Sequence, residues 1–385
     1  MKFLGIKRPD GKVGVRNQVV VLPSVVCASE VCNAIAQKVK GVISIPHTHG
    51  CTQLAHDAQQ TARTLIGIGR NPNVAAVLVI GLGCEMIEPS SIAFGIEESN
   101  KLVRSLVIQE IGGTPKAIKE GIKIVQEMLA YASRFKRERV SMDSLILGVE
   151  CGGSDACSGL SANPALGITS DLLIKEGGTV ILSETTESIG AEHILAKRAI
   201  NRSVARKILQ IVKRTERQAL SFGVDIAKAN PTPGNYKGGI TTLEEKSLGC
   251  VMKGGSSRVM EVLEYAETPT QKGLVLMDTP GQDAESVTGL AAGGAQIIAF
   301  TTGRGTPLGS AIAPVIKIAT NSYVYSKMRE NMDINAGEII TGNKSVQDVG
   351  EKILREVIRV ASGKLTKSEI LGHREFAINR IGPSF

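Results

Sequence analysis

Residues 144–155 read SLILGVECGGSD, and this stretch decides how the rest of the chain is interpreted. Its first half is apolar and typical of a short buried strand, whereas its second half brings two adjacent glycines, a thiol, two carboxylates and a hydroxyl. Glycines at a strand end let the backbone bend sharply and approach a ligand closely. Because open α/β sheets bind ligands at the carboxyl ends of their strands, we expect an active-site wall here rather than a tight turn with an incidental buried cysteine.

An apolar strand that ends in a polar cluster recurs along the chain, with helical patterns between the strands. The clusters lie at residues 47–51, 81–85, 150–155, 184–187, 278–281 and 301–305. Alternating strands and helices predict parallel sheets with helices on their faces, and right-handed crossovers bring the strand ends of one sheet to one edge. The predicted fold class is therefore α/β, with two mostly parallel, three-layer α/β units and the site at the carboxyl ends of the strands.

The chain is long enough for two domains. Its 385 residues exceed the usual size of a single domain. The charged segment 134–139 interrupts the alternation of strands and helices, so we predict an N-terminal α/β domain at 1–138 and a C-terminal α/β domain at 139–385. Residues 230–239 hold two prolines and three glycines, which predict a segment without regular structure.

Composition excludes several classes of partner. Tryptophan is absent and aromatic residues make up 3% of the chain, so stacking platforms for nucleic acid are hard to build and no nucleic-acid partner is expected. Lys and Arg number 45 against 37 Asp and Glu, a net charge of +8. The acidic residues are interleaved with the basic ones, which is typical of solvated helix faces; a basic pocket for an anionic substrate is the alternative.

The cellular location is predicted from the absence of a membrane span and of a signal peptide. No apolar run approaches the roughly 20 residues of a membrane span, and charges interrupt the first residues too early for a signal peptide. We therefore expect no membrane association. Seven cysteines without a dense framework fit a reducing cytosol, so the predicted location is cytoplasmic.

Ligands for a transition metal follow several predicted strands. His47, His49 and Cys51 alternate, which places their side chains on one face of an extended segment, and imidazoles and thiolates suit iron or zinc. Thiols at three strand ends could hold one iron or, as a second choice, an iron–sulfur cluster with an open site. The candidate metal ligands are Cys51, Cys84, Cys151, His47 and Glu85, whereas Cys27, Cys32, Cys157 and Cys250 are interpreted as small core residues, as is typical of buried cysteine.

Several familiar motifs are absent. Residues 81–86, GLGCEM, have Met where a dinucleotide fingerprint needs its third glycine, and 303–309 fails in the same way. No phosphate-binding P-loop occurs, and Ser154 does not lie in a G-x-S-x-G sequence, so serine hydrolysis is not supported.

Two arginines near glycine and hydroxyl clusters could hold a carboxylate. The arginine fork binds carboxylates in bidentate fashion, and we favour Arg16 and Arg304 for this role over a surface charge. Lys246 and Lys317 are balanced between the two interpretations. Ser154 and Asp155 are the candidates for contacts with substrate hydroxyls.

Taken together, these stretches resemble the altronate/galactarate dehydratase family over nearly the whole chain and in order. The matching segments are 11–17 (GKVGVRN), 49–51 (HGC), 81–85 (GLGCE), 151–155 (CGGSD), 158–165 (SGLSANPA), 245–249 (EKSLG), 300–305 (FTTGRG) and 333–337 (DINAG). The resemblance implies a metal-dependent hydro-lyase that acts on sugar acids, with Fe²⁺ as the metal and Mn²⁺ as a second candidate. Altronate would give 2-keto-3-deoxygluconate. Within these segments we also assign Asn17, Asn163, Thr301 and Thr302 to the substrate contacts.

The resemblance also implies a partner. Single-chain members of the family look longer, with a small N-terminal domain ahead of this region, so the chain resembles the large subunit of a split enzyme with a separate small subunit; it could also form a homo-oligomer. The large subunit of (2R)-sulfolactate sulfo-lyase is similar, which makes β-elimination of sulfite an alternative function. A non-catalytic binding subunit is the second alternative.

The implied chemistry is the same for both lyases. A 2-hydroxy carboxylate is held by Arg16 or Arg304 and by the metal, a base removes the proton next to the carboxylate, and the β leaving group departs. The candidate bases are His49, Glu187 and His193, since general acid–base groups contribute roughly 10²–10⁴-fold to such reactions.

Overall fold

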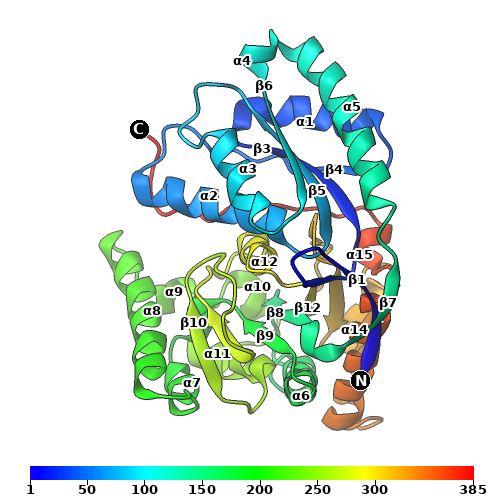
Figure 1. Cartoon of the computed structure of the whole chain (residues 1–385). Helices are drawn as coiled ribbons and strands as arrows, with labels where there is room; N and C mark the ends of the chain where they lie inside the picture. The colour runs from blue at the N-terminus through cyan, green and yellow to red at the C-terminus, as the bar shows by residue number, and fades with distance from the viewer.

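The structure is a computed structural model that describes all 385 residues, and its first layer is a four-stranded parallel sheet (Figure 1). In spatial order its strands are β4 (Val42–Ser44), β3 (Gln18–Pro23), β5 (Val74–Gly81) and β6 (Leu102–Val107). Strand β5 is buried along its whole length, as its unbroken apolar sequence requires of a strand covered on both faces. Helices α1 (Ser29–Lys38) and α5 (Thr114–Ala132) cover one face, and α2 (Ala55–Arg70) and α3 (Pro89–Glu97) cover the other. The short helix α4 (Ile108–Ile111) follows β6.

A seven-stranded sheet forms the second layer, and it is also parallel throughout. In spatial order its strands are β10 (Val259–Leu263), β11 (Gly273–Met277), β9 (Thr179–Leu182), β8 (Ile146–Gly152), β12 (Ile297–Thr302), β13 (Val315–Ala319) and β14 (Ile334–Asn335). Strand β8 lies at the centre, and it holds residues 146–152 of the stretch 144–155. The prediction of an α/β fold with parallel sheets is confirmed.

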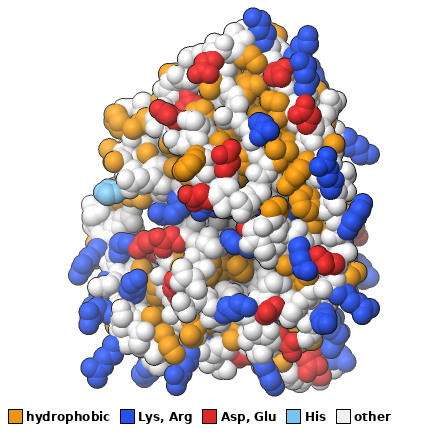
Figure 2. All heavy atoms as spheres, viewed as in Figure 1, with side chains coloured by type: hydrophobic (Ala, Val, Ile, Leu, Met, Phe, Trp, Pro, Cys, Tyr) orange, Lys and Arg blue, Asp and Glu red, His pale blue; other side chains and the backbone are white.

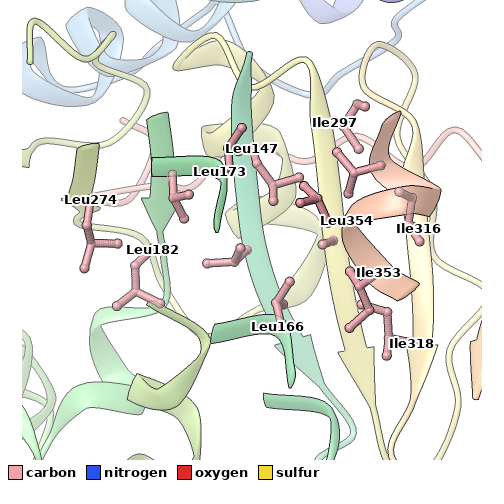
Figure 3. Close-up of a cluster of buried hydrophobic side chains, with 14 of the residues drawn as sticks. Leu147, Leu166, Leu173, Leu182, Leu274, Ile297, Ile316, Ile318, Ile353 and Leu354 are labelled. Atoms are coloured by element: carbon pink, nitrogen blue, oxygen red, sulfur yellow. The ribbon is translucent and has the colours of Figure 1, made fainter. Parts of the chain in front are cut away.

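The seven-stranded sheet has a core on each face. On one face, α6 (Ala162–Lys175) and α14 (Val346–Ala361) bury leucine and isoleucine side chains against the strands, and Figure 3 shows Leu166 and Ile353 among them. On the other face lies α12 (Asp283–Ala292), which packs against α2 of the first layer. Leu65 of α2 and Phe300 of β12 belong to one continuous hydrophobic cluster, so the two parallel sheets share a core.

A third, antiparallel sheet joins the beginning of the chain to its middle. Strand β1 (Lys2–Lys7) pairs with β2 (Val13–Gly14) on one side and with β7 (Arg137–Ser141) on the other. The domain boundary that the sequence predicts at residue 138 falls inside β7. The charged residues there pair as an exposed strand, which the sequence analysis did not anticipate.

The remaining helices lie on and around the second layer. They are α7 (Glu192–Lys197), α8 (Arg202–Ser221), α9 (Ile226–Ala229), α10 (Pro233–Lys237), α11 (Leu243–Val251), α13 (Ser322–Lys327) and α15 (Lys367–Ile370). Helix α10 corrects the expectation that 230–239 holds no regular structure. Pro233 occupies the first helical turn, where its missing N–H does no harm, and Thr232 and Asn235 form a reciprocal capping box.

Helices α2 and α12 place the carboxyl ends of both parallel sheets on the same side of the molecule. Gln60, early in α2, shares a cavity wall with Thr279, which precedes α12, and Gly67 late in α2 touches Ala292 at the end of α12. The two helices therefore run in the same direction. Because each starts from the strand ends of its own sheet, the polar segments that follow β4 and β11 face the same side.

The surface carries mixed charge. Figure 2 shows Lys and Arg side chains spread around this face of the molecule, with Asp and Glu among them, rather than one continuous basic surface. No helix combines the length and the apolar content that crossing a membrane requires.

Candidate active site

A fully buried group of two thiols, a carboxylate and an ammonium lies at the carboxyl edge of the seven-stranded sheet. We call Cys151, Glu184, Cys250 and Lys253 the Cys151 group. Cys151 ends β8, Glu184 follows β9, and the other two come from α11 and the turn after it. None is more than 4% exposed. The two Sγ atoms are 3.6 Å apart, and Cys151 Sγ is 3.7 Å from Glu184 Oε1.

Lys253 compensates the negative charge of this group. Its Nζ forms an ion pair with Glu184 Oε2 and donates a hydrogen bond to Cys250 Sγ at 3.1 Å. Burial alone lowers the pKa of Lys253, but the surrounding Cys151, Cys250 and Glu184 raise it well above its ordinary range, so the ammonium stays charged. The pKa of Cys151 is raised because its thiol donates to Cys250 and because burial disfavours the thiolate.

A second buried carboxyl group, Glu150, lies beside the Cys151 group. Its Oε2 accepts hydrogen bonds from the hydroxyls of Ser183 and Ser286, and its Oε1 has no partner. Burial raises the pKa of Glu150 well above its ordinary value, and the nearby Glu184 adds to this shift. Burial therefore favours the neutral form of the Glu150 carboxyl group.

The loop after β9 has a strained backbone that Thr279 holds in place. Glu184 has a φ of 67° in the left-handed region, which a residue with a side chain rarely adopts. Its N–H donates to Thr279 Oγ1 at 2.7 Å, and the N–H of Thr185 donates to the Thr279 carbonyl at 2.9 Å. Such conformations persist where the surroundings over-determine them, and they cluster at functional sites. This turn directs Glu184 into the Cys151 group while Glu187 comes next to α11.

Glu187 has one bonded and one free carboxylate oxygen. Its Oε1 accepts hydrogen bonds from Lys246 Nζ at 2.9 Å and from Asn230 Nδ2 at 3.1 Å. Its Oε2 is buried and has no partner. Glu187 therefore has an oriented carboxylate with one oxygen that no protein group occupies.

A cleft of about 460 Å³ opens between the loop after β8 and helix α11. Polar groups of Ser154, Asn163 and Lys246 line it, and apolar side chains, among them the largely exposed Leu160 and Leu248, also contribute to its walls. A few convergent polar groups within a partly apolar hollow are typical of small-molecule sites.

Four of the predicted substrate contacts at this edge are bonded to the protein itself. Asp155 accepts hydrogen bonds from Ser158, Thr320 and Asn321. Thr301 Oγ1 donates to Asn163 Oδ1 at 2.6 Å, while Thr302 Oγ1 accepts from the N–H of Gly305. Asn163 Nδ2 in turn donates to the Gly249 carbonyl at 3.0 Å. These side chains do meet at the strand ends, but all four hold the neighbouring strands and loops together. Ser154 and the exposed Arg304 keep their polar groups available.

Arg16 and Asn17 lie elsewhere and are corrections to the sequence analysis. All five N–H groups of Arg16 are engaged: Glu369 accepts two hydrogen bonds in bidentate fashion, and the carbonyls of Val15, Val360 and Lys364 accept the others. Asn17 accepts from Arg8 and donates to the Ala132 carbonyl. No donor of Arg16 remains for a substrate, because the end of the chain folds over this segment.

The predicted metal ligands do not come together. The only set of three His, Cys, Asp or Glu whose ligand atoms lie within 4.8 Å of one another is Cys151, Glu184 and Cys250. Cys51 and Cys84 are exposed at the ends of the four-stranded sheet. Cys250, which we interpreted as a core residue, and Glu184 were therefore missed. Glu184 belongs to the polar cluster 184–187 and Cys250 directly follows the segment 245–249, but nothing in local spacing places either next to Cys151.

His47 and Glu85 have structural roles that exclude metal binding in this conformation. One ring nitrogen of His47 bonds to the Pro23 carbonyl at 2.7 Å, and the other accepts the N–H of His49 at 3.1 Å. Both oxygens of Glu85 accept two hydrogen bonds each, from the Ser24 hydroxyl and from the N–H groups of residues 82–84. Burial alone raises the pKa of Glu85, but these hydrogen bonds outweigh it and leave the pKa lowered.

The two candidate histidine bases lie away from the Cys151 group. His49 is buried at the end of the four-stranded sheet, where its Nε2 has no partner and burial lowers its pKa. His193 is exposed on α7 and makes no hydrogen bond. Of the three predicted bases, Glu187 is the one that lies at the carboxyl edge of the seven-stranded sheet with an oriented carboxylate.

Asp283 is a further residue at this edge that the sequence analysis missed. A Cβ added at Gly152 would lie 2.4 Å from Asp283 Oδ2, so the glycine leaves room for this carboxyl group. Burial raises the pKa of Asp283 to about 7, and the nearby Glu184 and Glu187 contribute. In the sequence, Gly152 is the feature that could have indicated this contact, but Asp283 lies 131 positions further along the chain.

Comparison with known proteins places the chain in a family. The family model described as D-galactarate dehydratase/altronate hydrolase, second domain, matches residues 5–133, and the one described as D-galactarate/altronate dehydratase, C-terminal, matches residues 142–384. The resemblance drawn from the sequence is thereby confirmed.

Three curated relatives show how far the likeness extends. An altronate dehydratase of Bacillus subtilis is 38% identical over 99% of this chain and 78% of its own length. The (2R)-sulfolactate sulfo-lyase subunit beta of Chromohalobacter salexigens is 38% identical over 98% of this chain and 97% of its own length. A galactarate dehydratase (L-threo-forming) of Escherichia coli is 36% identical over 99% and 77%. With its two family domains, its relatives among lyases and its carboxylate-rich strand edge, this chain belongs to the D-galactarate/altronate dehydratase family.

Proposed function

We propose that the chain is a lyase that removes water from a sugar acid by β-elimination, and that the site is the carboxyl edge of the seven-stranded sheet. The observation that carries this proposal is Glu187, whose Oε2 is buried without a partner while Lys246 and Asn230 fix its other oxygen. Removal of a proton next to a carboxylate needs such a base, and the relatives named altronate dehydratase and galactarate dehydratase support the substrate class.

The proposed elimination conserves atoms and electrons. Glu187 Oε2 takes the proton from the α carbon, and the electron pair of that C–H bond spreads onto the carboxylate as an enediolate before it forms the double bond between the α and β carbons. The β hydroxyl leaves with its bonding pair and takes up one proton to give water. The enol that remains tautomerises to a 2-keto-3-deoxy acid. Asp283, with a pKa of about 7, is our candidate for supplying the proton to the leaving hydroxyl.

Ser154 and Arg304 are the proposed contacts for substrate hydroxyls. Ser154 lines the cleft, and Arg304 follows β12 with a guanidinium that has no protein partner. Arg304 Cβ lies close to Gly153, where an added Cβ would be 3.5 Å away, so both residues belong to the same strand edge.

We also propose that a divalent metal, iron above manganese, binds at the Cys151 group. The donor set fits because thiolates and a carboxylate suit iron, and two thiolates and one carboxylate opposite one ammonium leave a net charge of −2 for the metal to neutralise. Glu184 Oε1 faces the Cys151 thiol, and Lys253 would remain a hydrogen-bond donor to the ligands. Bound there, the metal would act as a Lewis acid towards oxygen ligands.

The activity is tested on the purified chain, prepared anaerobically with Fe²⁺ and assayed for 2-keto acid with altronate, galactarate and related sugar acids. Glu187→Gln should lower kcat by roughly 10²–10⁴-fold with the fold unchanged. His193→Gln, a substitution on the exposed face of α7, should leave kcat unchanged. If no sugar acid yields product, with or without a second subunit, the dehydratase proposal fails.

Metal binding is tested separately by metal analysis. Wild type should retain iron, whereas Cys151→Ala and Cys250→Ala should each lose most of it, because metal affinity depends on every thiolate ligand. Cys84→Ala is the matched control at an exposed position and should retain wild-type iron. Equal iron content in all four proteins would contradict the assignment.

Elimination of sulfite is the second candidate function. It is supported by the (2R)-sulfolactate sulfo-lyase subunit beta, which is 38% identical to this chain over 387 residues. On the name of that relative we also propose a second subunit as partner. Release of sulfite from sulfolactate, measured in the same assays, separates this function from dehydration. A chain that binds sugar acids but catalyses neither reaction would instead be a binding subunit.

A further inference from the structure

Lys246 lies between the cleft and the proposed base Glu187. It lies in the first turns of α11, lines the 460 Å³ cleft, and has a side chain only 10% exposed. Its Nζ donates to Glu187 Oε1 at 2.9 Å and to Asn230 Oδ1 at 2.8 Å. An ammonium has three donors, so one N–H of Lys246 is left without a protein acceptor.

The hydrogen bonds of Glu187 are distributed unevenly. Lys246 and Asn230 both donate to Oε1, and nothing donates to the buried Oε2. Because Lys246 lines the cleft and contacts Glu187, a ligand carboxylate that met its free N–H would lie near the Glu187 carboxylate. One side chain thus borders both the cleft and the base.

Other cations near the cleft are less suited to this role. Arg198 lines the cleft, but its Nε and Nη2 donate to the carbonyls of Ser257 and Gly254, and it forms no hydrogen bond with Glu187. Lys253 is fully buried in the Cys151 group. Arg304 is exposed to solvent, where a charge–charge attraction is several-fold weaker than in a partly buried site.

We propose that Lys246 binds the carboxylate of the substrate and makes the site specific for sugar acids over their neutral analogues. This inference rests on the proposed function. With the carboxylate on Lys246, the α carbon lies next to Glu187 Oε2. When Glu187 takes the α proton, the electron pair that remains spreads onto the carboxylate as an enediolate. The ammonium then faces the oxygens on which negative charge develops. A preorganised positive charge in a poorly solvated site stabilises that charge and so lowers the activation free energy of proton removal.

The test compares a sugar acid with its neutral amide in wild type, Lys246→Met and Lys237→Met. Lys237 is an exposed lysine of α10 in the neighbouring segment, so its substitution is a matched control for charge loss. Wild type and Lys237→Met should prefer the acid over the amide by about 10- to 100-fold in kcat/KM, as expected for a hydrogen bond to a charged group. Lys246→Met should lose this preference, with turnover of the acid falling much further than turnover of the amide.

A structural role for Lys246 would lower both turnovers together, and that result, with the acid preference retained, would overturn the proposal. Lys246→Arg should restore part of the preference.

A binding measurement by calorimetry keeps the inference testable without turnover, using an unreactive 3-deoxy sugar acid. Binding by wild type that is lost in Lys246→Met supports the inference even if no lyase activity exists, in which case only the proposed function fails. Equal binding by both proteins, or no binding by wild type, contradicts the inference.

Discussion

Whether a polar side chain is free or already bonded separates the proposed site residues of this protein from its structural ones. Arg16 and Arg304 have the same side chain, but Arg16 has no unused donor and Arg304 has no protein partner. Glu187 and Glu85 differ in the same way, since four donors surround the Glu85 carboxylate and one oxygen of Glu187 is left free. A group whose hydrogen bonds are all made inside the protein has none to offer to a substrate.

The buried pair of Arg16 and Glu369 should therefore affect stability and not catalysis. Arg16→Met leaves the partly buried Glu369 carboxylate without its cation, which should reduce the free energy of unfolding by about 3–5 kcal/mol in urea titrations. Lys123→Met, which breaks the exposed pair with Glu120, should change it by less than about 1 kcal/mol. The folded fraction of Arg16→Met should keep the wild-type KM for the sugar acid; a large rise in KM at unchanged stability would restore Arg16 as a substrate contact.

His47 should make stability depend on pH. Burial lowers its pKa from an ordinary 6.5 to about 4, so the unfolded chain takes up this proton before the folded chain does. Its contribution is fully present above pH 6.5 and is lost as the pH falls towards 4, by up to about 3 kcal/mol at 1.36 kcal/mol per pKa unit. Urea unfolding of His47→Gln between these pH values should show a shallower loss of stability than wild type. The exposed His193→Gln should keep the wild-type slope, and equal slopes for all three proteins would contradict this explanation.

At the scale of elements, the packing of α2 on α12 decides where the site lies. The two helices run in the same direction, so the strand ends of both parallel sheets face one side. Their close approach depends on Gly67, where an added Cβ would lie 2.4 Å from the carbonyl oxygen of Ala292. A backbone atom cannot move aside as the end of a side chain can.

Gly67→Ala should therefore destabilise the protein by about 1–3 kcal/mol through overpacking, even though alanine is the better helix former. Gly121→Ala in α5 is the matched control. Its added Cβ would also lie 2.4 Å from a neighbour, but that neighbour is the terminal methyl of Ile35, which can change rotamer. Thermal unfolding of the two variants should show a clearly lower Tm for Gly67→Ala only. Equal losses would mean that the helix contact is as adaptable as a side chain.

At the scale of the whole molecule, the end of the chain returns to the four-stranded sheet. Figure 1 shows the C-terminal segment running along the molecule to end near α2. There the N–H of Ile381 donates to Asp57 at 3.1 Å, Arg380 pairs with the same carboxylate, and the N–H of Phe385 donates to the Thr52 carbonyl. The segment thereby holds the loop that carries His49 and Cys51.

Deleting residues 380–385 should loosen this loop and leave the seven-stranded sheet intact. Hydrogen exchange should become faster for amides at 49–57, since local openings depend on the contacts of each segment, while amides of β8 and β12 keep their protection. Arg380→Ala removes the ion pair but keeps the backbone hydrogen bonds, so its effect should be intermediate. Uniformly faster exchange over the whole chain would show instead that the segment supports the global fold.

Much of the architecture was predictable from the sequence because it depends on neighbours along the chain. Apolar runs followed by glycine and polar residues predicted parallel strands that end at one edge, and the structure confirms both sheets. The pairing of β1 with β7 was not predicted, because two charged, half-exposed strands about 130 residues apart have no local pattern that marks them as partners. Helix α10 was missed because the capping box of Thr232 outweighs the glycines and prolines around it.

The sequence by itself determined the fold class, the family and the list of polar residues that could do chemistry. It could not determine which of them meet. Cys151 contacts Cys250 across 99 positions of the chain and Glu184 across 33, and Arg16 loses its donors to Glu369, which lies 353 positions away. The hydrogen-bonding capacity of a side chain is limited, so its role depends on which distant groups occupy it. Only the tertiary structure decides that, because it alone brings those groups within about 3 Å of one another.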